Sequence, residues 1–183
     1  HLLEDVWRLF EVETFVFQSV RRYDRHPEHY EDWPATLVAL SQSGHLDRRR
    51  LLDACRQAIG AEFSNAAITG FIYLHERLEL TDDEIAAGQG PYLELLSSRK
   101  SHVVTFALDV LGGLEKDSRL DGEGFLNNAK SVFGLKPKSQ PKAVLSLAAK
   151  IVKRQPELVP QAVELATEAL THESVDVQEQ AAG

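Results

Sequence analysis

Apolar residues recur along this chain at the spacing of one helical face. The clearest case is the set Val103, Val104, Ala107, Leu108 and Leu111, which follows a period of about 3.6 residues. The same pattern predicts helices over residues 2–22, 33–43, 48–59, 64–78, 100–114, 122–133, 140–154 and 160–170. No segment alternates apolar and polar residues for long enough to demand a sheet. The sequence therefore predicts an all-α fold.

Capping residues and short turns rich in glycine and proline mark the ends of these helices. Asp47 stands where it can cap one helix, and Gly44 where it can end the helix before it. Thr81 and Glu84 have the spacing of a capping box. We expect a loop at 23–32 and a break at 88–91 that leaves only a brief helix at 92–96. Because short turns join antiparallel neighbours, the helices are expected to form antiparallel pairs.

A small residue recurs inside successive apolar segments: Gly70, Ala107, Ala148 and then Ala181 or Ala182. The first two spacings are 37 and 41 residues, and the third is about 34. A small side chain at such a position lets two helices approach closely. A recurrence of this length, with two helices in each unit, is typical of stacked helical repeats. We therefore expect a right-handed α-α superhelix, a solenoid of the HEAT or armadillo type.

The domain organisation follows from this interpretation. Residues 1–183 are expected to be a single solenoid fragment of a longer protein, because the chain opens and stops inside apparent helices. Within it we expect an N-terminal helix and loop at 1–32, the first helical units at 33–80 and HEAT-like repeats at 81–183.

Several segments carry a resemblance to known helical repeats. Three segments resemble the second helices of HEAT-like repeats: Lys100–Leu111, Pro141–Ala149 and His172–Ala182. The chain is also similar to an uncharacterised family of large helical-repeat proteins of actinobacteria, a domain of unknown function. The matching segments are Gly44–Ala54, Phe71–Glu76, Arg119–Asp121 and His172–Gln178. The resemblance implies a helical-repeat architecture and a bacterial source, and it brings no established activity.

Composition and charge narrow the class of protein. The formal net charge of −8 argues against a protein whose whole surface binds nucleic acid or anionic lipid. No apolar run approaches the roughly 20 residues of a membrane span, and the first residues do not resemble a signal peptide. We expect a cytoplasmic protein that does not associate with membranes. Its single cysteine, Cys55, lies on an apolar stripe and is expected to be a buried small hydrophobe.

Histidines beside acids are the candidates for catalysis or metal binding. His26 and His29, with the acids that follow them, have the donors of a metal site, but Pro27 interrupts a segment that has the composition of a loop. His75 and His172 each precede a glutamate, yet adjacent helical residues do not face each other, so we expect both to bond main-chain carbonyls. No phosphate-binding loop or nucleophile elbow is present. The sequence predicts no catalytic residue, no metal, no cofactor and no enzyme activity.

Basic residues gather in two places despite the acidic net charge. Between Glu123 and Glu157 the chain has seven basic side chains and no acidic one. On the helix at 140–154 they lie opposite the apolar face, which is typical of a solvated surface but also suits an acidic partner. A second cluster occupies the first turn of the helix at 48–59. The candidate partner-binding residues are Arg48, Arg49, Arg50, Lys142, Lys150, Lys153 and Arg154.

These observations favour an interaction protein over an enzyme. We expect a non-catalytic scaffold that presents a solenoid surface to a macromolecule, most simply another protein, through the second helices of its repeats. The alternative is a nucleic-acid-binding solenoid that uses the basic segment 124–156.

Overall fold

The computed structural model of the chain describes residues 2–14, 17 and 32–183. Within those ranges every regular element is a helix and no strand is present, so the prediction of an all-α fold is confirmed. The chain divides into two compact units, His1–Leu80 and Thr81–Gly183. Each unit is described by itself.

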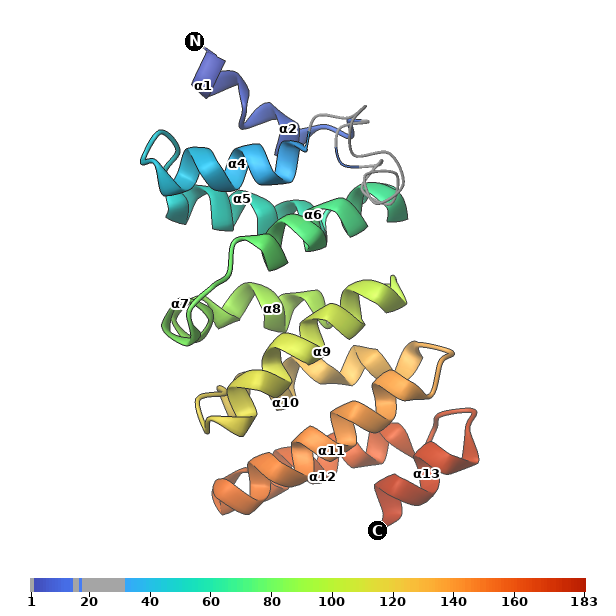
Figure 1. Cartoon of the computed structure of the whole chain (residues 1–183). Helices are drawn as coiled ribbons and strands as arrows, with labels where there is room; N and C mark the ends of the chain where they lie inside the picture. Colours follow the sequence, from blue (N-terminus) through green and yellow to red (C-terminus); the bar gives the residue numbers. More distant parts are fainter. Residues whose placement is uncertain (1, 15–16, 18–31) are drawn as a thin grey trace. The chain divides into compact units, whose positions relative to one another are not determined.

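Among its described residues, the first unit has two single-turn helices and three longer ones (Figure 1). They are α1 (Leu2–Asp5), α2 (Arg8–Glu11), α4 (Trp33–Gln42), α5 (Arg48–Gly60) and α6 (Asn65–Arg77). The longer helices begin at side chains that accept a backbone N–H three residues ahead: Asp32 caps α4, Asp47 caps α5 and Ser64 caps α6. Gly44 follows α4 at φ 76°, which confirms its predicted place at the helix end.

The predicted first helix is wrong in length. Helix α2 ends at Glu11, and Val12 is extended at φ −125° and ψ 144°. The next residue makes a tertiary contact in place of a further helical turn: the carboxylate of Glu13 accepts the Ser64 N–H at 3.2 Å. The rest of the predicted helix, apart from Phe17, and most of the predicted loop at 23–32 lie outside the described residues.

A cluster of aromatic rings forms part of the core of the first unit. Phe17 and Phe71 lie 4.3 Å apart between ring centroids, and Phe10 lies within 5.8 Å of both. Gly70, the residue before Phe71, faces the same segment: a Cβ at this position would overlap the carbonyl oxygen of Phe17. The expected close approach at Gly70 is confirmed, but its partner is the N-terminal segment and not a helix of a following repeat.

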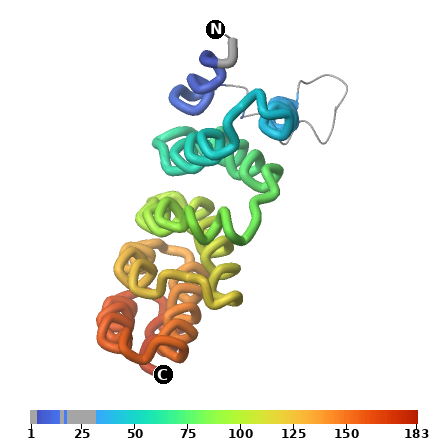
Figure 2. Tube along the Cα trace, turned by 90° about the vertical axis from the view of Figure 1, so that its left-hand side faces the viewer, coloured from blue at the N-terminus to red at the C-terminus, as the bar shows by residue number. Residues whose placement is uncertain are grey.

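The second unit arranges its longer helices in two layers (Figure 2). One layer runs through α8, α10 and α12 and the other through α9, α11 and α13, with each helix contacting the next in its layer. The elements are α7 (Asp82–Ala87), α8 (Gln89–Leu95), α9 (Ser101–Lys116), α10 (Gly122–Asn128), the 3-10 helix η2 (Ala129–Gly134), α11 (Ser139–Arg154), the 3-10 helix η3 (Pro156–Leu158), α12 (Val159–Ala169) and α13 (Val175–Ala182).

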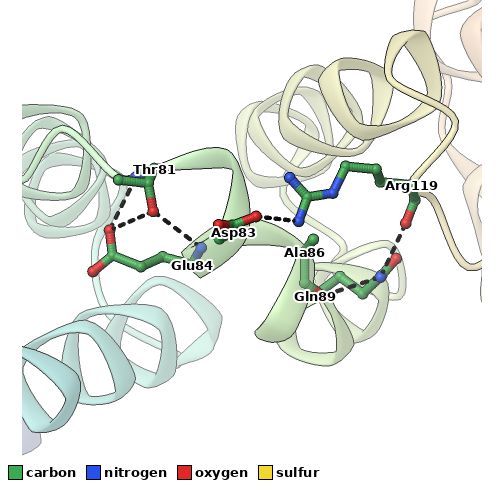
Figure 3. Close-up of polar contacts among 6 residues, drawn as sticks. All are labelled: Thr81, Asp83, Glu84, Ala86, Gln89 and Arg119. Atoms are coloured by element: carbon green, nitrogen blue, oxygen red, sulfur yellow. Dashed lines mark hydrogen bonds and ion pairs between the residues drawn. The ribbon is translucent and has the colours of Figure 1, made fainter.

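Side-chain caps open two helices of the second unit, α7 at Thr81 and α10 at Asp121. The capping box of Thr81 and Glu84 is present in full at the start of α7 (Figure 3). The predicted break at 88–91 is confirmed at Gly88, which ends α7, but it is shorter than predicted. Helix α8 begins at Gln89 and takes Gly90 and Pro91 into its first turn, where proline needs no N–H partner. The predicted helix over 122–133 is α-helical only as far as Asn128, and from residue 129 the chain continues as the tighter 3-10 helix η2.

A pair of polar contacts repeats between the helices of the second layer. Gln140 of α11 donates from Nε2 to Thr105 Oγ1 of α9 at 2.9 Å. Gln180 of α13 donates in the same way to Ser146 Oγ of α11 at 3.0 Å. The two acceptors are 41 residues apart, which is also the spacing of Ala107 and Ala148, and both alanines are buried. The interval read from the small residues therefore recurs in the hydrogen bonding of α9, α11 and α13.

Candidate functional site

Arg154 is a structural residue at the end of α11. Its Nη2 donates to Glu115 Oε2 at 2.8 Å and to the Leu120 carbonyl at 3.3 Å. The Glu115 side chain is only 5% exposed, so the guanidinium neutralises a buried carboxylate. This predicted partner-binding side chain is thus engaged within the second unit.

Two further cations of the segment 124–156 are paired in the same manner. Lys130 donates to Glu164 at 3.1 Å and Lys138 donates to Asp176 at 2.5 Å. The hydrogen bond and charge of Lys138 lower the pKa of the Asp176 carboxyl. The basic segment contains no acid of its own, but helices that lie 34 to 39 residues away in sequence supply acids to three of its seven cations.

The predicted lysines of α11 differ in their surroundings. Lys150 and Lys153 are exposed, and across residues 32–183 no hydrogen bond or ion pair engages either of them. Lys142 is half-buried and close enough to Asp176 to contribute to its lowered pKa. We refer to Lys150 and Lys153 as the exposed lysine pair.

The arginines of α5 in the first unit are also unequal. Arg48 donates to the Leu78 carbonyl at 2.9 Å, and the guanidinium of Arg50 lies 4.1 Å from the centre of the Trp7 ring. Arg49 is exposed and makes no hydrogen bond or ion pair among the described residues. The run of three arginines therefore presents one unengaged cation.

Burial shifts the pKa of two side chains in the first unit, Cys55 and His75. Cys55 is fully buried, donates from Sγ to the Phe71 carbonyl at 3.2 Å, and burial raises the pKa of its thiol to about 12. The prediction of a buried thiol is confirmed, and a protonated, inaccessible sulfur is a poor nucleophile. His75 is 5% exposed, and burial, aided by the charge of Arg56, lowers its pKa to about 4.

The remaining histidine predictions concern His172, which lies among the described residues, and the pair His26 and His29. His172 Nδ1 accepts the Ser174 N–H at 3.0 Å, so Nε2 carries the proton and donates to the Leu135 carbonyl at 3.1 Å. Its predicted bond to a main-chain carbonyl is confirmed. His26 and His29 lie outside the described residues. Among the residues that are described, no group of three or more His, Cys, Asp or Glu side chains is placed to hold a metal ion.

The sequence analysis did not find a polar hollow in the second unit. It has a volume of about 570 Å³, and its walls come from the start of α9 and from the end of η2. The lining residues are Ser97, Ser98, Arg99, Ser101, Ser131, Gly134, Leu135, Lys136 and Pro137. The run Ser97-Ser98-Arg99 is its one visible sequence signal, but nothing local connects that run with Lys136.

Comparison with known proteins identifies the family of this chain but gives no information on its activity or ligands. Helices long and apolar enough to cross a membrane are absent from the described part of the chain. No curated protein and no solved structure matches the sequence. The family described as "Domain of unknown function (DUF6493)" matches residues 1–139. Since this match spans most of the chain, including all of the first unit and the second unit as far as the start of α11, the protein belongs to the DUF6493 family.

Proposed function

We propose that this chain is a non-catalytic interaction module, a HEAT-like solenoid with a right-handed superhelical course that binds another protein. The observation that carries the proposal is the repeated contact of Gln140 with Thr105 and of Gln180 with Ser146. Stacked helical repeats are joined by nearest-neighbour interfaces that recur in this way, and they work by presenting an extended surface. A cytoplasmic location is part of the proposal, supported by a lone cysteine that stays a buried free thiol.

The contact that we propose between this chain and its partner is electrostatic. The exposed lysine pair stands free on α11, whereas Lys130, Lys138 and Arg154 are neutralised by acids of the same unit. Cations without an internal partner steer acidic surfaces toward them and set the orientation of the complex. We therefore expect a partner with a local acidic patch.

The test is affinity capture with the 183-residue chain as bait, followed by measurement of the dissociation constant of each captured protein. The double variant Lys150→Glu/Lys153→Glu is expected to weaken binding by about tenfold or more, because each attractive contact becomes repulsive. The matched control Arg8→Glu/Lys116→Glu makes the same change of charge at other exposed positions and is expected to stay within about twofold. Equal weakening by both variants, or no saturable partner, would contradict the proposal.

A nucleic-acid partner is the second candidate, and the exposed lysine pair is the observation that favours it. The three internal ion pairs weigh against it, because they leave the segment with less free positive charge than its sequence has. Fluorescence anisotropy with a duplex DNA at low salt decides the question. Binding that falls steeply with salt and is lost in Lys150→Gln/Lys153→Gln favours nucleic acid, whereas no binding at about 20 mM salt removes it.

A further inference from the structure

The polar hollow of the second unit has the charge of an anion site. Its lining contains no carboxylate and two cations, Arg99 and Lys136. Both cations are exposed, and neither makes a hydrogen bond or an ion pair with any residue that the structure describes. They come from segments 37 residues apart, so the fold, and not the local sequence, brings two uncompensated positive charges to one cavity of about 570 Å³.

Two serine hydroxyls in the hollow are free to donate. Ser98 Oγ accepts the Lys100 N–H at 3.2 Å, and Ser101 Oγ accepts from Gln140 Nε2 at 2.6 Å. A hydroxyl oxygen that already accepts a protein hydrogen bond still carries one hydrogen that it can donate. These two groups therefore add neutral donors to the two cations.

The start of α9 adds a further favourable contribution. Ser101 is the first residue of this helix, and Lys100 before it provides no side-chain cap. In the same unit α7 and α10 are capped by Thr81 and Asp121. The positive end of a 16-residue helix dipole thus lies at the wall of the hollow without a side-chain acceptor.

We propose that this hollow binds the phosphate group of a phosphorylated serine or threonine side chain on a partner protein. The inference rests on the proposed function and names the chemistry of the partner. A phosphate monoester carries nearly two negative charges at neutral pH and has three strong acceptor oxygens, which matches two cations and two hydroxyl donors. The lining has no aromatic side chain to stack on a nucleobase, and its apolar residues, Leu135 and Pro137, can contact a short stem.

Nuclear magnetic resonance titration of the whole chain tests the site directly. Inorganic phosphate and then N-acetyl-O-phosphoserine amide are added at constant ionic strength, and the backbone amide shifts are followed. We expect saturable shifts at Ser101 and its neighbours. Arg99→Gln/Lys136→Gln is expected to raise the dissociation constant by about tenfold or more. The matched control Arg8→Gln/Lys116→Gln removes the same charge at exposed positions that do not line the hollow, and it is expected to change the constant by less than about twofold.

The outcomes separate the possible sources of the phosphate. Binding of phosphoserine amide at least as tight as that of inorganic phosphate supports the proposal. It is overturned by the absence of saturable shifts at these amides, by equal weakening in both double variants, or by binding of inorganic phosphate alone. Displacement of phosphate by a short duplex DNA at equal or higher affinity also overturns it, in favour of a nucleic-acid backbone.

The test is independent of the one for the interaction module. If a captured protein binds the chain with unchanged affinity after Arg99→Gln/Lys136→Gln, and phosphate does not bind, this inference fails while the module stands. If phosphoserine amide binds the hollow and no protein is captured, the phosphate site stands and the proposed function fails.

Discussion

The helices inside each of the two units pack in different ways. In the first unit, aromatic rings gather around one glycine whose α-hydrogen faces a neighbouring backbone, so one position sets the fit of Phe17 against α6. In the second unit, the layer of α9, α11 and α13 is joined by polar contacts that return every 40 or so residues. The first arrangement depends on a single close approach, whereas the second distributes its stability over repeated small contributions.

The largest effect is therefore expected at Gly70. Replacing it with alanine places a Cβ against the Phe17 carbonyl, and such overpacking costs about 3 kcal/mol. Gly112 in α9 is the matched control, because a Cβ there meets nothing within 4 Å and alanine should stabilise that helix by about 0.5–1 kcal/mol. Urea denaturation followed by far-ultraviolet circular dichroism measures both variants, and tryptophan fluorescence reports the first unit by itself, since both tryptophans, Trp7 and Trp33, belong to it. Equal stability of the two variants would contradict the comparison.

The pH dependence of the first unit should come next in size. The pKa of His75 is lowered to about 4, so folding favours its neutral form. The contribution of His75 to the free energy of unfolding is complete above the unfolded pKa of about 6.5 and is lost as the pH falls toward 4. The loss between pH 7 and pH 4.5 amounts to about 2.5 kcal/mol. His75→Gln should remove this part of the slope, whereas His45→Gln, at an exposed position, should retain it. Tryptophan-detected denaturation at several pH values measures both, and equal slopes in the two variants would refute this role of His75.

In the second unit the largest single effect is expected at Arg154. Arg154→Met leaves Glu115 buried without its cation, which should lower the free energy of unfolding by about 2 kcal/mol. Lys138→Met breaks a more exposed pair and should cost much less. Adding Glu115→Gln to Arg154→Met should recover part of the loss. Hydrogen exchange read by mass spectrometry over residues 101–154 measures these differences, and similar losses for the two methionine variants would rule out a special role for the buried pair.

The smallest expected effect concerns the repeated contact itself. Gln140→Leu removes the donor to Thr105 and to Ser101 and should cost about 1 kcal/mol, because hydrogen bonds at a buried position are lost. Gln180→Leu removes the equivalent donor at a half-buried position and should cost less. Exchange protection of α9 and α11 distinguishes the two variants. If neither variant changes protection, the contact marks the repeat without stabilising it.

Helix positions could largely be predicted, because their signals act over three or four residues. Asp47, Ser64, Thr81 and Asp121 each accept an N–H from the third residue ahead, a bond that the local sequence suffices to specify. The errors occur where a distant group intervenes. The first helix ends at Glu11 beside the contact of Glu13 with Ser64, and no pattern near Glu13 announces a partner 51 residues away.

The sequence by itself determined that the chain is helical, where most helices begin, and the interval of about 40 residues at which buried alanines recur, because periodicity and capping are local properties of the chain. Only the tertiary structure decided which charges remain free. Arg154 has the same character in the sequence as Lys150, yet one faces a buried glutamate and the other faces solvent. Charge compensation depends on distance in space, so acids 34 to 39 residues away in sequence pair with three of the seven cations of the basic segment, whereas Arg99 and Lys136 line a hollow that contains no carboxylate.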